Sequence, residues 1–309
     1  MDEAIKYISK VEIKGLFWDG TLRVWNLDPK VNILSGPNGT GKSSILRYVY
    51  EAATEGFMNI DMPPKIEDFT LTFDNGQTLK LDKDFLYVEQ PPTKNKSANL
   101  PALKNIKFPH VDFIKPIDNK LLVRETAQKF DGEIKTYLDW LIYLLQKKYL
   151  SYQVDLGKRA LRLNGNNSEQ KRKEISQPRE RFIEILNEVS SHTGKYVDDT
   201  ENEILFCLDD KEISPYHLSS GEKQILIILL TTLVQDQQPY ILFMDEPEIS
   251  IHFDVQKKLI SYIRELNPNV QIILATHSPA IIMGGWMDKV KEISDLIVTD
   301  NQAVLENAE

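Results

Sequence analysis

The segment from Gly36 to Ser43 reads Gly-Pro-Asn-Gly-Thr-Gly-Lys-Ser, and its residue types are those that bind phosphate. It fits the pattern GxxxxGK followed by Ser or Thr, between an apolar strand-like run, residues 31–34, and a helical stretch. In such a loop the main-chain N–H groups close around the α- and β-phosphates, Lys42 reaches the β- and γ-phosphates, and Ser43 offers its hydroxyl to Mg²⁺. The sequence therefore predicts ATP and Mg²⁺ as cofactors, bound by Gly36, Asn38, Gly39, Thr40, Gly41, Lys42, Ser43 and Ser44.

Two adjacent carboxylates follow a second apolar run. Residues 240–244 read as a buried strand, and Asp245 and Glu246 come directly after it, before Pro247. Parallel sheets deliver catalytic groups to a ligand at the carboxyl ends of their strands. We expect Asp245 to hold the metal, and Glu246 to orient or deprotonate the water that attacks the γ-phosphate. A helix cap before Pro247 is the alternative role for this pair.

A histidine follows a third apolar run. The segment Gln271-Ile272-Ile273-Leu274-Ala275 leads through Thr276 to His277. Because this strand also ends in a polar group, we expect His277 at the same sheet edge as Asp245, where it would contact the γ-phosphate or the attacking water. A lone histidine in another setting is more often structural.

A pair of serines precedes the most apolar helix of the chain. Leu218-Ser219-Ser220-Gly221-Glu222 begins a helix that carries several apolar residues between 225 and 229. Ser219 and Ser220 fit the role of a cap for a core helix. The same exposed amides also form an anion site, which a phosphate would satisfy.

The elements around these motifs alternate between strand and helix patterns. We expect a single composite α/β domain rather than two small ones. The predicted strands are 5–13, 22–34, 66–90 with a hairpin turn at 74–76, one near Ile204, 240–244 and 271–275; the predicted helices are 43–55, about 124–163, about 178–189 and one from Gly221, with a turn at 19–20 and a mobile loop at 91–101.

Charge limits the classes of partner. The formal net charge is -9, so the surface as a whole is not a nucleic-acid platform. Between Lys158 and Arg181, however, basic residues clearly outnumber acidic ones. That stretch is either a solvated helix face or a surface that docks nucleic acid or a protein partner.

Cysteine usage and hydropathy indicate a compartment. Cys207 is the single cysteine, so no intrachain disulfide is possible, as is typical of the reducing cytoplasm. The first residues lack the apolar core of a signal peptide, and the longest apolar stretch, 225–234, is too short to cross a bilayer. We expect a cytoplasmic protein with no membrane partner.

In order along the chain, the phosphate loop, residues 218–222, Asp245-Glu246 and His277 resemble the motifs of the ATP-binding-cassette (ABC) superfamily, in its non-transporter branch of SMC, RecF and OLD-like ATPases. The resemblance implies an α/β fold: a P-loop NTPase of the ABC ATPase head type, with a mixed sheet core, an antiparallel β subdomain and a helical lobe. Its divisions would be about 1–117 with the phosphate loop, about 118–200 as a helical insertion, and about 201–309 with the remaining motifs.

The same resemblance implies a homodimer or higher homo-oligomer. In that superfamily the serines and glycine of the signature segment, here residues 218–222, reach the γ-phosphate bound by a partner. Ser219, Ser220 and Gly221 would then act in trans. The signature reads LSSGE rather than LSGGQ, and His252 stands where transporters usually have an aspartate. Gln90 is a weak candidate for the family's glutamine loop, and no residue is assigned to the adenine pocket.

The segments 266–268, 277–282 and 285–288 look like those of stand-alone ATPases from bacterial defence modules. These act beside a separately encoded nuclease or toxin, and few residues follow His277 in which a TOPRIM nuclease could be built, so we expect the effector on another chain. A RecF-like repair ATPase, with DNA bound through 158–181, is one alternative. A non-hydrolytic ATP switch is another, and a transporter subunit fits least.

Overall fold

The computed structural model describes residues 4–55, 66–82, 85–89, 108–116, 133–163 and 168–298. The chain forms two compact units, each assembled from segments far apart in sequence. Unit 1 comprises Met1–Ile114, Pro239–Glu246 and Val270–Glu309, and unit 2 comprises Lys115–Gln238 and Pro247–Asn269. The predicted loop at 91–101, the candidate Gln90, residues 124–132 and the loop at 164–167 lie outside the described residues.

A parallel sheet in unit 1 carries the strands that end in polar motifs. Its strand order is β13-β3-β12-β11-β7, and all four pairings are parallel. The central strands are largely buried, with Asn32 and Gln271 as polar residues among apolar ones, and residues 42–55 pack against β11 and β12. Pairing places Asp245 opposite Ala275, and Ala275 opposite Leu34, so these three strands end at one edge. The strands are β3 (Val31–Ser35), β7 (Val111–Ile114), β11 (Tyr240–Asp245), β12 (Val270–Ala275) and β13 (Val290–Glu292).

A second sheet of unit 1 is antiparallel, with the order β2-β1-β4-β5-β6. The hairpin expected at 74–76 is confirmed: Gly76 has φ 79°, and the Phe73 N–H donates to Gln77 O at 2.9 Å. A glycine accepts this left-handed conformation without steric cost. The strands are β1 (Ile8–Lys14), β2 (Leu22–Asn26), β4 (Asp68–Phe73), β5 (Thr78–Asp82) and β6 (Phe85–Glu89).

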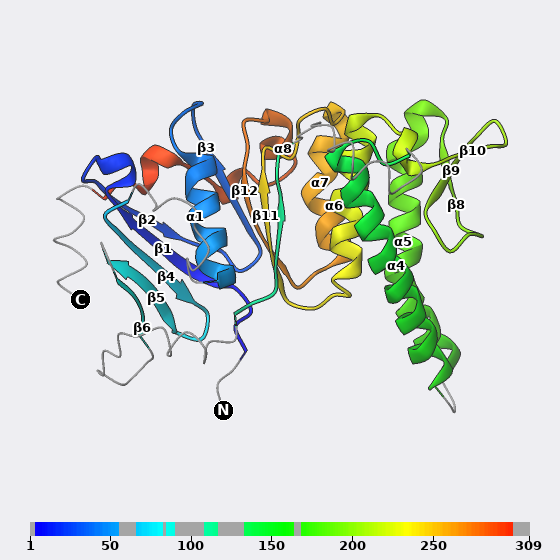
Figure 1. Cartoon of the computed structure of the whole chain (residues 1–309), viewed down its shortest axis with the longest axis horizontal. Coiled ribbons are helices and arrows are strands. Elements are labelled where there is room, and N and C mark those ends of the chain that lie inside the picture. Colours follow the sequence, from blue (N-terminus) through cyan, green and yellow to red (C-terminus); the bar gives the residue numbers. More distant parts are fainter. Residues whose placement is uncertain are drawn as a thin grey trace. The chain divides into compact units, whose positions relative to one another are not determined.

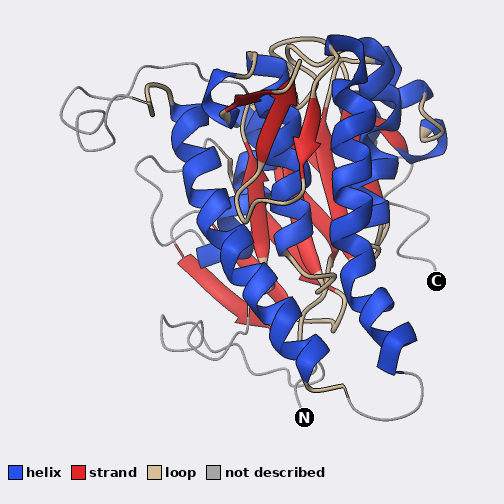
Figure 2. Ribbon diagram, turned by 90° about the vertical axis from the view of Figure 1, so that its right-hand side faces the viewer, coloured by secondary structure: helices blue, strands red, loops and turns tan. Residues whose placement is uncertain are grey.

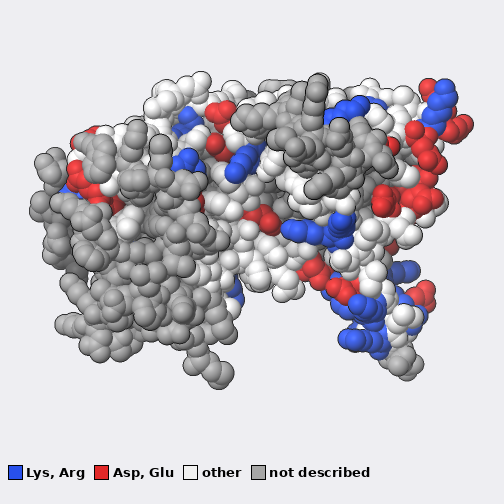
Figure 3. Space-filling model, in the orientation of Figure 1, with Lys and Arg blue, Asp and Glu red and all other residues white. Residues whose placement is uncertain are grey.

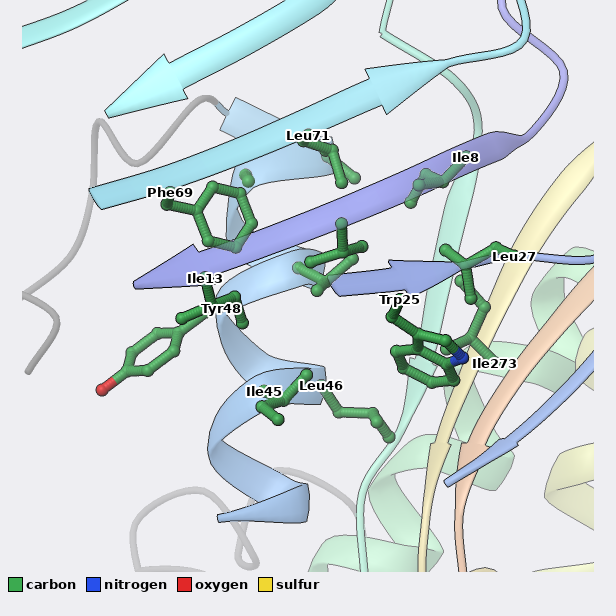
Figure 4. Close-up of a cluster of buried hydrophobic side chains, with 14 of the residues drawn as sticks. Ile8, Ile13, Trp25, Leu27, Ile45, Leu46, Tyr48, Phe69, Leu71 and Ile273 are labelled. Carbon is green, nitrogen blue, oxygen red and sulfur yellow. The ribbon is translucent and has the colours of Figure 1, made fainter. Parts of the chain in front are cut away.

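Helix α1 (Lys42–Glu55) packs against both sheets of unit 1. Figure 4 shows Ile45, Leu46 and Tyr48 of α1 facing apolar side chains of β1, β2 and β4. The sheets are also joined by a polar side chain, because Gln271 of β12 bonds to both main-chain groups of Ile8 at 2.8 Å. The phosphate loop is thus anchored by a helix with an extensive buried face.

Unit 2 is a layer of helices with a small sheet of three strands. The helix α6 (Ser220–Val234) is buried over almost its whole length and lies among α4 (Tyr137–Leu161), α5 (Ser168–Ser190) and α7 (Phe253–Leu266). A helix that is apolar on all sides needs such a central position. The helices α4 and α5 form a long antiparallel hairpin, seen from two sides in Figures 1 and 2. The small sheet has the order β10-β9-β8, from β8 (Tyr196–Asp198), β9 (Leu205–Leu208) and β10 (Lys211–Ile213).

Near the phosphate loop one sequence prediction is corrected, and one element is found that was not predicted from the sequence. Residues 22–34 form two strands in different sheets, β2 and β3, rather than one. Pro29 lacks the N–H that a continuous ladder needs, and Asp28 Oδ1 accepts from Lys30 N at 2.7 Å, which closes a turn. A 3-10 helix, η1 (Leu16–Trp18), follows β1 and was not predicted.

Two helix boundaries are also corrected. The helix expected from about Pro178 begins at Ser168, and Pro178 lies inside it. Glu174, whose carbonyl has lost its partner N–H at 178, is exposed, so water can replace that bond. The helix expected from about Arg124 can be compared from residue 133 onward, and there α4 begins at Tyr137, where Thr136 and Asp139 form a capping box.

Candidate functional site

The phosphate loop connects β3 to α1 and turns tightly on glycines. Gly36 and Gly41 have φ 138° and 102°, backbone conformations that a side chain would strain. A Cβ at Gly41 would also lie 3.0 Å from Phe17 Cε2, so the aromatic ring packs directly on the loop. Thr40 Oγ1 donates to Pro37 O at 2.8 Å and holds the loop closed from within. Asn38 and Gly39 are exposed at its tip, and Ser44 lies in the first turn of α1.

Lys42 and Ser43 place a cation and a hydroxyl at the start of α1. Lys42 is 4% exposed, and its Nζ donates to Gly36 O and Pro37 O, each at 2.9 Å. Ser43 Oγ donates to Asp245 Oδ1 at 2.9 Å, although the two residues are far apart in sequence. This paired hydroxyl and carboxylate supplies the hard oxygen ligands that Mg²⁺ prefers, so these residues fit the metal.

Glu246 and His277 approach each other at the same sheet edge. His277 Nε2 lies 3.4 Å from Glu246 Oε1, and each side chain is about one-third exposed. Glu246 has φ 46°, a left-handed conformation that is uncommon outside glycine. Its N–H donates to Ala275 O at 2.9 Å, which continues the ladder and holds the strained residue in place. Strain held by such surroundings is frequent at functional positions.

The signature segment begins α6 in unit 2. Ser219 is the N-cap, and the Ser219–Glu222 pair forms a capping box. Lys195 Nζ donates to Glu222 Oε1 at 2.6 Å. Burial raises the pKa of Glu222, but the bonds from Lys195 and Ser219 outweigh burial and hold this pKa below its ordinary value. The charged carboxylate of Glu222 therefore holds the turn at Ser219 in place.

Sequence reasoning missed the contact that explains Gly221. A Cβ at this position would lie 1.9 Å from the carbonyl oxygen of Ser250, so only glycine fits. Ser250 has φ 66° and belongs to the loop that precedes α7. The signal was the retention of Gly221 although Ser220 replaces the other glycine of LSGGQ.

Phe17 was missed as well. It has φ 58° and is 47% exposed, which is unusual for a large aromatic residue pressed on a loop. The aromatic pair Phe17-Trp18 before Asp19-Gly20 was the available signal. A half-exposed ring beside a phosphate loop offers a stacking surface for a planar group.

The expected residues therefore fall into two groups. Unit 1 brings together the phosphate loop, Asp245, Glu246 and His277, and unit 2 contains Ser219, Ser220 and Gly221. Cys207 is a buried free thiol. Each helix that the structure describes is too short or too polar to cross a bilayer.

The basic stretch between Lys158 and Arg181 lies along the α4–α5 hairpin. Figure 3 shows Lys and Arg side chains gathered over the end of the hairpin where α4 stops and α5 begins. Several of these cations have partners, such as Arg159 with Asp236 at 2.9 Å and Arg181 with Glu265 at 2.6 Å. Exposed basic side chains between 158 and 173 remain on the hairpin surface.

Residues 94–283 match the protein-family model described as "AAA domain, putative AbiEii toxin, Type IV TA system". The match covers more than half of the chain and includes the signature segment, Asp245, Glu246 and His277. The phosphate loop precedes the matched region.

Shorter stretches match curated proteins. The chain is 27% identical over 150 residues to the "Retron Vc95 probable ATPase" of Vibrio cholerae, which covers 43% of this chain and 28% of that protein. It is 29% identical over 110 residues to the "Uncharacterized ABC transporter ATP-binding protein YejF" of Escherichia coli, which covers 32% of this chain and 20% of that protein. It is 39% identical over 82 residues to an "Uncharacterized ABC transporter ATP-binding protein" of Haemophilus influenzae, which covers 24% of this chain and 30% of that protein. The chain therefore matches less than a third of the length of each relative.

Solved structures extend the likeness to nearly the whole fold. An SMC head bound to the C-terminal winged-helix domain of ScpA aligns with TM-score 0.57 and 14% identity, over 90% of this chain and 92% of that one. An SMC head with an extended coiled coil, bound to the C-terminal domain of ScpA from Pyrococcus furiosus, aligns with TM-score 0.53 and 14% identity, over 98% and 99%. The expected P-loop NTPase fold of the ABC ATPase head type is confirmed.

Proposed function

Because the chain belongs to the AAA-domain family whose model it matches, and has an ABC/SMC-like ATPase fold, we propose that it binds ATP with Mg²⁺ and hydrolyses the γ-phosphate. The observation that carries this proposal is the pair of contacts at one sheet edge. Ser43 meets Asp245 at 2.9 Å, and Glu246 meets His277 at 3.4 Å. The first pair suits a metal, and the second pair suits a water and a phosphate oxygen.

The chemical roles follow from the side chains. Lys42 would exchange its bonds to Gly36 O and Pro37 O for bonds to the phosphate oxygens of an ATP bound at the same loop. Ser43 and Asp245 would hold Mg²⁺, which neutralises phosphate charge. Glu246 would take a proton from the attacking water, and His277 would donate a hydrogen bond to the γ-phosphate. Phe17 would stack on the adenine, since its ring lies beside Gly41.

We further propose that the complete site forms between two copies. Ser219, at the start of the long helix α6, is exposed, and a helix N-terminus attracts phosphate through its main-chain amides and its dipole. Ser219, Ser220 and Gly221 would contact the γ-phosphate bound to the other copy. The dimeric arrangement comes from the resemblance to the superfamily.

The biological proposal is control of a separately encoded effector, a nuclease or toxin, in phage defence in the cytoplasm. Its support is the family description, which names a toxin and a type IV TA system, and the relative named as a retron ATPase. ATP-driven dimerisation would switch the effector between held and released states.

Co-expression of the chain with the products of its neighbouring genes tests this proposal. The mass and ATP turnover of wild type and Glu246→Gln would be measured with ATP and Mg²⁺. We expect Glu246→Gln to hold a stable ATP-dependent complex that contains a second protein. A complex of this chain alone, with no partner in either nucleotide state, would contradict effector control.

The basic surface of the α4–α5 hairpin favours a second function, a RecF-like DNA-dependent ATPase. Under that alternative, DNA would raise ATP turnover, and binding would weaken steeply with salt. A Lys171→Glu, Lys173→Glu double variant would then lose the stimulation without losing basal turnover. If added DNA left the ATP turnover of the wild type unchanged, this function would be excluded.

A further inference from the structure

Two histidines and an aspartate lie together in unit 2, apart from the residues assigned above. His192 lies in the 3-10 helix η2 (Ser191–Thr193), His252 is the N-cap of α7, and Asp254 lies in the first turn of α7. One ligand atom from each side chain lies within 4.8 Å of the others, and all three residues are exposed. The two imidazole centroids are 5.3 Å apart.

The packing of two helices fixes this cluster. Two ion pairs, Arg181 with Glu265 and Glu188 with Lys258, each at 2.6 Å, show that α5 and α7 run antiparallel. The end of α5 therefore lies beside the beginning of α7. Since η2 directly follows α5, His192 is brought to the N-cap of α7. The two histidines thus meet through the fold rather than through sequence proximity.

The donor set suits a borderline-soft divalent ion. Two imidazoles and one carboxylate with an open fourth position are typical ligands of Zn²⁺, at bond lengths of about 2.0–2.2 Å. His252 Nδ1 lies 3.8 Å from Asp254 Oδ2, close to the spacing of about 3.3 Å that two ligands adopt around a tetrahedral ion. Small rotations of these exposed side chains would bring the ligand atoms to the spacing that a bound ion requires.

The hydrogen bond that the His252 side chain accepts as the N-cap is a weak one. The Asp254 N–H donates to His252 Nδ1 at 3.4 Å, longer than the usual distance of about 2.9–3.0 Å. Ser, Thr, Asp and Asn are the residues that cap helices well, and a histidine in their place is uncommon. We propose that His192, His252 and Asp254 form a binding site for a zinc-class divalent metal.

The metal site adjoins the signature segment. Thr193 Oγ1 and Lys195 Nζ, just after His192, donate to Glu222 Oε1 at 3.2 and 2.6 Å. Ser250, just before His252, places its carbonyl against Gly221. An ion held by His192 and His252 therefore ties together the two segments that flank the start of α6. Metal occupancy stiffens the turn that presents Ser219 and Ser220.

Equilibrium dialysis of the purified full-length protein against Zn²⁺, without nucleotide and in excess Mg²⁺, tests the proposal. We expect one bound Zn²⁺ per chain, and Co²⁺ in its place should give the visible absorption of a tetrahedral site. His192→Ala and Asp254→Asn should each weaken the Zn²⁺ Kd by ~10-fold or more. His217→Ala, which removes an exposed histidine of the same unit outside the cluster, should bind as wild type does.

Two outcomes would overturn the proposal. One is Zn²⁺ binding by His192→Ala and Asp254→Asn that equals binding by wild type. The other is loss of Zn²⁺ in Asp245→Asn with retention in His192→Ala, which would place the ion at the phosphate loop. Thermal unfolding in EDTA should be the same for wild type and His192→Ala, because His192 is exposed, and this comparison excludes misfolding as the cause. A negative result leaves the proposed ATP chemistry untouched, since the assay contains no nucleotide.

Discussion

Gly221 is a single residue that constrains two loops. Its missing side chain leaves room for the Ser250 carbonyl, so the signature segment and the loop before α7 are interlocked. Gly221→Ala should therefore destabilise the protein by about 1–3 kcal/mol, because one loop must move to admit the methyl group. Urea unfolding gives this difference in the free energy of unfolding.

Gly157→Ala is the matched control. Gly157 lies inside α4, and a Cβ there would meet no atom within 4 Å. Alanine has the better helix propensity, so this variant should gain about 0.5–1 kcal/mol. Equal effects of the two substitutions would mean that the Ser250 contact does not constrain position 221.

Lys42 and Glu246 should separate binding from chemistry. Lys42→Ala removes the cation of the phosphate loop, so the Kd for ATP should rise to the point where binding is lost. Glu246→Gln keeps the pair of Ser43 and Asp245, so ATP should still bind while kcat falls by about 10²-fold or more. Isothermal titration and single-turnover hydrolysis measure the two quantities. Tight ATP binding by Lys42→Ala would refute the site assignment.

At the scale of elements, Gln271 joins the two sheets of unit 1. It satisfies the main-chain N–H and C=O of Ile8 and donates to Asp28 O at 2.9 Å, in a fully buried position. Gln271→Leu would leave buried polar groups without partners, each at a cost of about 1–3 kcal/mol. We expect a large fall in melting temperature. Gln238→Leu, at a residue whose side chain makes only a local contact, should change it little.

Asp139 links the start of α4 to α6. Lys223 Nζ donates to its Oδ1 at 2.7 Å, and both side chains are largely buried. Burial raises the pKa of Asp139, but the bonds from Lys223, Thr136 and Lys135 outweigh burial and hold the pKa below its ordinary value. Asp139→Asn leaves the Lys223 ammonium unpaired and should cost about 3 kcal/mol at neutral pH.

The pH dependence of that cost has a definite sign. Since the folded-state pKa is depressed, the carboxylate stabilises the protein fully above its unfolded pKa of about 3.9 and loses this contribution as the pH falls through the folded value. The difference in unfolding free energy between wild type and Asp139→Asn should therefore shrink below about pH 4. A difference that stays constant down to pH 3 would contradict the depressed pKa.

Elements with one strong pattern were predictable from sequence, and elements set by tertiary contacts were not. The apolar runs before Asp245 and His277 fixed both strands and the shared edge, because full burial leaves a continuous apolar signature. The break between β2 and β3 was missed because residues on both sides are equally β-prone. The left-handed Phe17 and Ser250 depend on packing with Gly41 and Gly221, which no local pattern encodes.

At the scale of the whole molecule, the proposed shared site makes a prediction about mixed dimers. Ser219→Arg should prevent the signature segment from contacting the ATP bound by the partner copy. Lys42→Ala should prevent ATP binding at the variant's own phosphate loop. Each variant alone should therefore be inactive. Mixing the two should restore about a quarter of the wild-type rate, since half of randomly formed dimers are mixed and each has one complete site. ATP turnover across mixing ratios measures this. Full activity of Ser219→Arg alone would mean that one chain suffices.

The strand order of the parallel sheet also affects how the chain is made. The strand β3 emerges from the ribosome well before its neighbours β12 and β13, which come from residues beyond 269. Until then its apolar main chain has no native partner, and an unpaired strand is a template for wrong association. Contacts between such distant segments also form slowly. The nascent chain should therefore depend on chaperones until β12 has been made. A ribosome stalled before residue 270 should display a phosphate loop whose supporting strand has not yet been paired by β12.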